Sequence, residues 1–490
     1  MRAFALFGAA LIACGSARLK HAEAPGEAGA PAPVLRSRVP EPGPPAALRL
    51  PTQHHFELAN GLRVRLVEEH KLPIVSLHLV VNAGTVTEPP GKPGVASFTA
   101  AMLTEGTRRR SATRISDDLG FIGAGLTAGS SSDFAWVSGS VLSAHLAELL
   151  DIFADVVANP AFPRADFRRV QDQRLVSLIQ ERDRPGATVA KAFQALYWGD
   201  HPYGHWPLGT EKSVRATRRE DLMRHHASRY RPNASELVVV GDVEESNLKA
   251  LLEKALRQWR GTAPTPPRPA RPRPPALQTL LIGKRGPASQ SYVMMGMPGL
   301  ERSSPDYVAA EVAFQVLGGG TASRLFRDLR EKEGYTYGIY ARPDARKLGG
   351  TSLIVGSVKA DVTGAAMRAL LKEVADLRER PVMPEELAVA RNALLFSLPA
   401  DFATAAGTAD KLGEEVVFGL PDDYWEQFAG QVAQVSTADV QRMAQKYLDA
   451  AKLTTVMLCN PTQVRPQLDA LPLGTIEVRD APATKASDRR

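Results

Sequence analysis

A proline-rich segment divides this chain and limits what it can fold into. Seven of the fourteen residues in 263–276, "APTPPRPARPRPPA", are proline. Proline has a fixed φ and no backbone N–H, so this run favours extended polyproline geometry and excludes a regular helix or a central strand. The segment is therefore predicted to be a linker between a folded region at residues 51–262 and a second one at residues 277–475.

The two regions contain predicted elements in a similar order, which indicates an internal repeat. Each begins with alternating strand patterns, "GLRVRLVEE" and "PIVSLHLVVNAG" in the first and "QSYVMMGMPG" in the second. A helix, a glycine-rich turn and further helices follow, and each region closes with an apolar strand, "SELVVVGDV" or "AKLTTVMLCNP". This mixed order predicts an α+β fold of two homologous lobes. Each lobe is expected to be a mainly antiparallel sheet covered by helices, and the two together to form a clamshell.

The N-terminus is typical of an exported protein. Arg2 precedes the apolar run "AFALFGAALIA", which is too short to span a bilayer and leads into "LIAC" at Cys14. The pattern resembles the lipobox of bacterial lipoproteins, in which the cysteine is acylated; a plain signal peptide with a chance cysteine is the alternative. We therefore expect a signal peptide at residues 1–13 and a lipidated Cys14 on a disordered tether that extends to residue 50. The expected location is the periplasmic side of the cell envelope, with the outer membrane favoured because no Asp follows Cys14.

The positive charge of the chain is concentrated in its predicted linker and tails. The formal net charge is +7, of which residues 1–50 carry +3, residues 263–276 another +3 and the predicted tail at residues 476–490 the last +1. The remaining chain is therefore neutral. This distribution argues against a nucleic-acid partner, which would need a basic face on a folded domain.

Six motifs lie in order across the two lobes: "LANGLRV", "NAGTVTEPPGKPGVASF", "MLTEGT", "HPYGHWPLGT", "YRPNASELVVVGDV" and "SRLFRDLREKEGYTYGIYA". With these motifs the chain resembles the pitrilysin/insulinase zinc peptidases, and the resemblance covers about residues 50–470. Their order and spacing across both lobes carry the assignment. The resemblance implies a substrate that is an unfolded or extended peptide.

The zinc-binding positions of that family are altered in this chain. In active members, a helix matching residues 94–107 carries His-x-x-Glu-His, and a distal Glu supplies the third zinc ligand. Those positions fall here on Ser97, Ala100 and Ala101, with the distal ligand near Ser177. Neutral Ser and Ala cannot replace imidazole and carboxylate around zinc. We expect no metal or other cofactor in this chain, and zinc only in a partner subunit.

Other histidines and Ser97 offer weaker alternatives. His201 and His205 have helical spacing, but Pro202 and Gly204 predict a loop there. Adjacent histidines point in different directions on a helix or on a strand, so a packing or solvated role is expected for each. The adjacent pairs are His54 with His55 and His225 with His226. His78, in a predicted strand, is also expected to have a packing role. Ser97 has no base nearby in the sequence and no strand-turn-helix elbow, which disfavours a nucleophile.

The second lobe retains the family's substrate-contacting pair. An Arg and a Tyr seven residues apart match Arg330 and Tyr337, and the resemblance implies that they contact the substrate backbone and the developing oxyanion. Without the resemblance, a helix-capping Arg and a core Tyr would be favoured. Residues 318–320, "GGG", lack the Lys-Ser/Thr of a phosphate loop and are predicted to form a flexible turn before the Arg-bearing helix.

These features together suggest a division of labour between two chains. In some bacterial relatives, a zinc-bearing chain pairs with a degenerate chain that supplies the Arg/Tyr pair, and this sequence fits the second. Peptides would add to a sheet edge near residues 128–136, although the family's substrate-binding Asn is replaced by Thr127. A membrane-tethered peptide holder without a catalytic partner is the alternative, and an autonomous peptidase with unrecognised ligands is the third hypothesis.

Overall fold

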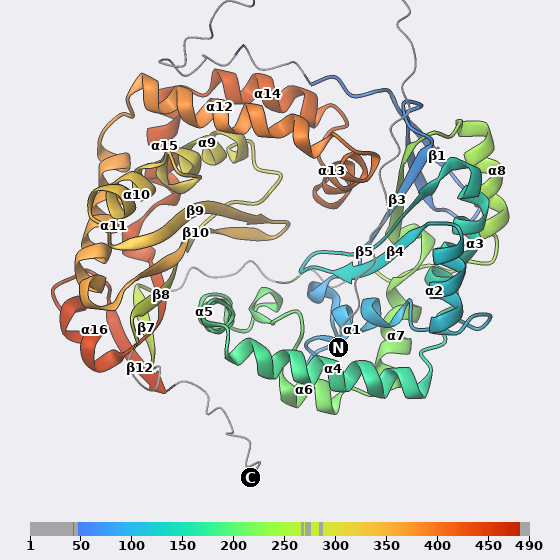
Figure 1. Cartoon of the computed structure of the whole chain (residues 1–490), viewed down its shortest axis with the longest axis horizontal. Helices are drawn as coiled ribbons and strands as arrows, with labels where there is room; N and C mark the ends of the chain where they lie inside the picture. Colours follow the sequence, from blue (N-terminus) through green and yellow to red (C-terminus); the bar gives the residue numbers. More distant parts are fainter. Residues whose placement is uncertain (1–42, 44–47, 266–268, 270–275, 284–287, 481–490) are drawn as a thin grey trace, which may run out of the picture. The chain divides into compact units, whose positions relative to one another are not determined.

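The computed structural model describes residues 48–265, 276–283 and 288–480, together with Gly43 and Pro269 (Figure 1). Its helices and strands all belong to one unit, Pro45–Arg490. The predicted signal peptide, Cys14 and most of the tether and the proline-rich linker lie outside the described residues. Among the helices that are described, none has the length and apolar character needed to cross a membrane.

The first lobe is built on a six-stranded sheet with the order β1-β2-β6-β3-β5-β4. All neighbouring pairs are antiparallel except β2 and β6. Its central strands are near-continuous apolar runs because both of their faces are covered. The strands are β1 (Gln53–Glu57), β2 (Arg63–Glu68), β3 (Ile74–Val81), β4 (Gly125–Ser130), β5 (Ala135–Leu142) and β6 (Ser235–Gly241).

Helices α3 and α8 cover one face of this sheet through Leu149, Phe153 and Leu252, which pack with the inward side chains of the strands. The helices are α1 (Val95–Met102), α2 (Ala112–Phe121), α3 (Leu146–Ala158), α4 (Arg164–Arg182), α5 (Pro185–Trp198), α6 (Glu211–Ala216), α7 (Arg219–Arg229) and α8 (Glu245–Leu256). Short 3-10 helices are η1 (Thr85–Thr87), η2 (Ser143–His145), η3 (Pro202–Gly204) and η4 (Pro232–Ala234).

The second lobe repeats the plan with the strand order β12-β7-β11-β8-β10-β9. The outer pairs β12–β7 and β7–β11 are parallel and the others antiparallel. The strands are β7 (Gln278–Gly283), β8 (Gln290–Pro298), β9 (Thr336–Arg346), β10 (Gly349–Lys359), β11 (Thr454–Cys459) and β12 (Thr475–Asp480). Five strands have the same order in both sheets, and only the outermost strand differs, since β1 begins the first lobe and β12 ends the second. This repeated order confirms the predicted α+β fold of two homologous, mainly antiparallel lobes.

The helices of the second lobe surround a core that includes Phe314, Leu370 and Trp425. They are α9 (Tyr307–Gly318), α10 (Arg324–Phe326), the π-helix η5 (Arg327–Lys332), α11 (Thr363–Glu379), α12 (Pro384–Asp401), α13 (Ala405–Phe418), α14 (Tyr424–Gln434), α15 (Thr437–Tyr447) and α16 (Pro461–Leu468). The 3-10 helices are η6 (Ala360–Val362) and η7 (Ala450–Lys452).

Each lobe covers the second face of the other lobe's sheet with one helix (Figure 1). From the first lobe, α5 packs Phe193 and Tyr197 against β8 and β11. From the second, α13 packs Leu412 against β3 and β6. Glycine permits both approaches, since a Cβ on Gly296 would lie 2.2 Å from the Phe193 ring and one on Gly413 would lie 2.8 Å from His78. The lobes are thus consecutive in sequence but interlocked in space.

Several boundaries differ from the sequence-based expectation. Strand β12 belongs to the second sheet, so this lobe extends to Asp480 and the tail expected from residue 476 begins within a strand. Leu48 and Leu50, expected in the tether, pack against the second core. The helix expected over residues 94–107 ends at Met102, because the chain then turns into a loop that pairs with Pro160 through Thr107.

Candidate functional site

Helix α1 carries three of the four altered zinc positions. Glu88 caps the helix, because its Oε1 accepts hydrogen bonds from the backbone N–H groups of Gly94 and Ala96, both at 2.9 Å. The backbone of Gly94 has a left-handed conformation, with φ of 94°. A Cβ on Gly94 would lie 2.9 Å from the backbone of Gly209, so the loop "PLGT" at residues 207–210 packs directly on the start of α1. Burial raises the pKa of Glu88. Ala100 is fully buried, which makes this end of the site close-packed.

A buried arginine from α4 lies beside Ser97. Arg174, which is 6% exposed, donates from Nη2 to Ser97 Oγ at 2.6 Å and to the carbonyl of Leu208 at 3.3 Å. Its guanidinium also lies 4.9 Å from the centre of the Phe98 ring. Burial lowers the pKa of Arg174 to about 10, so the side chain remains a cation at neutral pH, and Glu88 is the carboxylate that favours this charge.

The remaining zinc position, Ser177, lies on α4 one turn beyond Arg174 and is half-buried. Since α4 packs against α1, the four altered positions lie on two helices that are in contact. Ser97 itself donates its hydroxyl hydrogen to the carbonyl of Pro207 and has no base beside it, so it is not an activated nucleophile.

These residues do not fit a zinc ion. Ser97, Ala100, Ala101 and Ser177 offer two hydroxyl groups and no imidazole, thiolate or carboxylate. A second cation would also have to approach the Arg174 guanidinium, which lies within hydrogen-bonding distance of Ser97. Elsewhere in the part of the chain that the structure describes, no three His, Cys, Asp or Glu side chains are grouped to hold a metal.

The histidines serve structural roles. His201 and His205 flank the 3-10 helix η3, as the loop prediction requires, and His205 Nδ1 lies 3.8 Å from Glu88 Oε2. His225 and His226 are buried in α7, where burial lowers the pKa of each to about 4. His226 Nε2 is 2.8 Å from the carbonyl oxygen of Val157 and donates to it.

The histidines of two strands contact acidic side chains. On β1, His54 pairs with Glu245 at 3.2 Å and His55 with Asp422 at 3.0 Å, from opposite faces of the strand. On β3, His78 Nδ1 lies 2.8 Å from Asp410 Oδ1 and 2.9 Å from Ser138 Oγ. Both contacts of His78 use the same nitrogen, so these three residues do not form a Ser-His-Asp relay.

Arg330 and Tyr337 lie together at one edge of the second sheet. Arg330 belongs to the π-helix η5, and its guanidinium carbon is 4.3 Å from the centre of the Tyr337 ring. Arg330 Nη1 also donates to the backbone carbonyl of Tyr337. The Tyr337 side chain is 78% exposed on the edge strand β9, which excludes the core-tyrosine interpretation. Gly318, at the end of α9, is required by close packing, since its Cβ would lie 2.4 Å from Ala341 N.

The exposed edge of the first sheet is β4, Gly125–Ser130. The edge expected over residues 128–136 is therefore wrong in part, because this range includes a turn and the start of the inner strand β5. Thr127 lies on β4, opposite Ser138. No hydrogen bond or ion pair among the described residues joins the Ser97 region to Arg330 or Tyr337, which lie on different lobes.

Comparison with known proteins identifies the family. Residues 63–205 match the description "Insulinase (Peptidase family M16)", and residues 217–394 match "Peptidase M16 inactive domain". This chain belongs to peptidase family M16. The match confirms the resemblance to the insulinase peptidases that the motifs indicate. The M16 description of residues 217–394 as an inactive domain applies to a stretch that contains both Arg330 and Tyr337.

The relatives of this chain include both a protein named as a protease and one named as a non-peptidase. An uncharacterized zinc protease of Mycobacterium leprae is 28% identical over 398 residues, which cover 80% of this chain and 88% of that protein. A non-peptidase homolog of Helicobacter pylori is 22% identical over 395 residues, which cover 80% of this chain and 90% of that protein. Sequence similarity within M16 therefore extends to both zinc proteases and non-peptidases.

Solved M16 structures share the fold. The crystal structure of a peptidase M16 inactive domain from Pseudomonas fluorescens has a TM-score of 0.78 and 28% identity. The match covers 83% of this chain and 98% of the Pseudomonas chain. The structure of a Helicobacter pylori protease has a TM-score of 0.79 and 19% identity, and the match covers 84% of this chain and 100% of that protein. At this identity the likeness concerns the fold alone. The likeness confirms the expected two-lobed clamshell. The chain is thus a peptidase-like M16 protein.

Two residues of the altered site were not predicted from the sequence. Arg174 is one of many basic residues on a polar helix, and its burial depends on packing against α1. Glu88 lies within the motif "NAGTVTEPPGKPGVASF", and its position before the helix could have indicated a cap for α1.

Proposed function

We propose that this chain is the non-catalytic subunit of a heteromeric zinc metallopeptidase. The observation that carries the proposal is the contrast between its two lobes. In the first lobe the ligand positions are Ser and Ala beside the Arg174 cation, whereas in the second Arg330 and Tyr337 remain paired and Tyr337 is exposed. The zinc and its general base would be supplied by a homologous partner subunit.

Arg330 and Tyr337 suit the role of binding and oxyanion stabilisation. A guanidinium and a phenol can donate to a peptide carbonyl, and both would stabilise negative charge as it develops on that oxygen. Contact between the Arg330 guanidinium and the Tyr337 ring restrains both side chains, so less side-chain entropy is lost on binding. To reach a substrate, Arg330 would exchange its bond to the Tyr337 carbonyl for one to the peptide.

An extended peptide is the substrate class that the sheet edges favour. Strand β4 has a neighbour on one side only, so its free backbone groups can pair with an added strand. The same edge supports the alternative function of a peptide-binding or scaffold protein without peptidase activity. We also propose that the chain is exported and held in the bacterial cell envelope through a lipidated Cys14, on the periplasmic side.

A pull-down of the tagged full chain in mild detergent, with mass spectrometry of the co-purified proteins, tests the heteromer. Recovery of an equal amount of an M16 chain with an intact His-x-x-Glu-His motif is expected. Recovery of the bait alone, with peptide binding retained, would favour the scaffold alternative. Stoichiometric zinc in the isolated chain would contradict both and indicate an autonomous peptidase.

Substitution of the Arg/Tyr pair should reduce the activity of the complex. Arg330→Ala and Tyr337→Phe are each expected to lower kcat/KM by about 100-fold, since each removes one donor to the developing oxyanion. The measurement is peptide hydrolysis by the reconstituted complex. Lys332→Ala on η5 and Tyr340→Phe on β9 are matched controls, because both are exposed neighbours outside the pair. Unchanged turnover in Arg330→Ala would contradict the proposed role.

A further inference from the structure

The helix-covered face of the first lobe contains a groove that the proposed function does not use. It has a volume of about 610 Å³ and lies between α3 and the C-terminal half of α8. Apolar side chains from both helices line it, including Leu150, Ala154, Leu251 and Ala255. This groove is on the opposite face of the first sheet from α13 and is remote from the Arg330–Tyr337 pair in the second lobe.

Three exposed cations surround the groove. They are Arg108 in the loop after α1 and Lys254 and Arg257 at the end of α8. Within the described part of the chain, no carboxylate forms an ion pair with any of the three; the nearest acidic residues of the groove, Asp151 and Asp155, pair with other arginines. Because the folded regions are neutral as a whole, this cluster is a local excess of positive charge.

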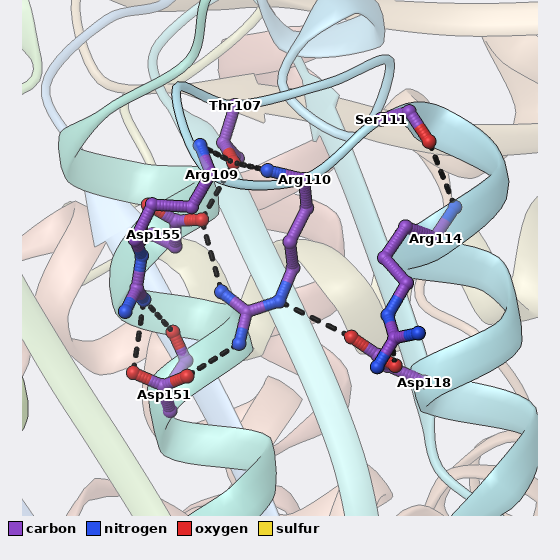
Figure 2. A network of polar contacts seen from close by, with 8 residues as sticks. All are labelled: Thr107, Arg109, Arg110, Ser111, Arg114, Asp118, Asp151 and Asp155. Atoms are coloured by element: carbon purple, nitrogen blue, oxygen red, sulfur yellow. Dashed lines mark hydrogen bonds and ion pairs between the residues drawn. The ribbon is translucent and has the colours of Figure 1, made fainter.

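The acidic side chains of the groove already form ion pairs with Arg109 and Arg110 (Figure 2). Asp155 is fully buried, accepts a hydrogen bond from the Thr107 hydroxyl and lies 3.0 Å from Arg110 Nη1. Arg109 pairs with Asp151 at 2.9 Å, and Arg110 contacts Asp151 as well. This network fixes the loop after α1 onto α3, which holds Arg108 at the end of the groove.

We propose that this groove binds an acidic segment of another protein. Apolar side chains of the segment would pack against α3 and α8, and its carboxylates would approach Arg108, Lys254 and Arg257. A nucleic acid would need a longer basic track than three side chains. A flat bilayer surface would leave the apolar groove between the helices unfilled. Charge and shape together therefore favour an acidic, partly apolar protein segment.

Fluorescence anisotropy with a labelled helical peptide of Glu, Leu and Ala tests this proposal on the full chain. The peptide is expected to bind, with an affinity that falls as salt is added. Changing Arg108, Lys254 and Arg257 together to Glu should weaken binding by about tenfold or more, because three favourable charge contacts become repulsive. The matched control changes three exposed cations of α4 and α6 to Glu and should leave binding intact; they are Arg168, Lys212 and Arg215.

Three outcomes would overturn the proposal. The first is equal binding by the charge-reversed variant and its control. The second is equal binding of a peptide in which Gln replaces Glu, which would remove charge as the basis of recognition. The third is failure of the peptide to bind while vesicles containing phosphatidylglycerol, or a second copy of this chain, bind through the same three cations. None of these results depends on peptidase activity, so the test is separate from that of the proposed heteromer.

Discussion

Replacing Arg174 by Met is expected to lower the free energy of unfolding by about 3 kcal/mol. The substitution keeps most of the side-chain volume but removes the guanidinium cation, which attracts the buried Glu88 carboxyl electrostatically. It also leaves Ser97 Oγ and the Leu208 carbonyl without the Arg174 donor. The loss of the contact with the Phe98 ring adds to the effect. Urea unfolding followed by tryptophan fluorescence measures the change.

Arg168→Met on the same helix is the control, since Arg168 is exposed and its substitution should cost less than about 0.5 kcal/mol. Addition of a chelator should leave the unfolding curve of the parent chain unchanged, because the site offers no zinc ligands. A stability loss for Arg174→Met no greater than that of the control would show that the guanidinium does not hold α1 and α4 together. A chelator-sensitive curve would contradict the assignment of Ser97 and its neighbours as a lost metal site.

The sequence predicts those parts of the site that the resemblance to the insulinase peptidases assigns to short motifs. Arg330 and Tyr337 are seven residues apart, and the short turn between them brings both side chains to the same edge. The lost zinc ligands follow in the same way from the resemblance, which assigns the ligand positions to Ser97, Ala101 and the distant Ser177. Once the family supplies these positions, the residue types in the sequence are enough to predict the loss.

Features that depend on packing between distant segments are not predicted. Arg174 resembles its exposed neighbours on α4, and only contact with α1 distinguishes it. The exchange of α5 and α13 between lobes is similarly hidden, because an amphipathic helix does not specify which sheet it covers. Strand β1, "QHHFE", contains too few apolar residues to show a strand pattern and is stabilised by pairing with β2.

Glu415 should make the contact between α13 and the first sheet dependent on pH. Its Oε2 lies 2.6 Å from Arg65 Nη1 on β2, and its side chain is fully buried. Burial raises the pKa of Glu415 to about 8, Arg65 opposes this shift and Asp422 reinforces it. The folded chain therefore holds a proton that the unfolded chain releases near the ordinary pKa of 4.5. This contribution to stability is complete below pH 4.5 and is lost as the pH rises towards 8.

Glu415→Gln cannot release this proton, so its stability relative to the parent should increase with pH. The difference in unfolding free energy is expected to grow by on the order of 3 kcal/mol between about pH 5 and about pH 8, and then to level off. Urea unfolding across this range measures it. Subtracting the parent removes the titration of all other groups, which both chains share. The exposed control Glu220→Gln should run parallel to the parent; parallel curves for Glu415→Gln as well would show that Glu415 is ionised throughout and bound to Arg65 as a permanent ion pair.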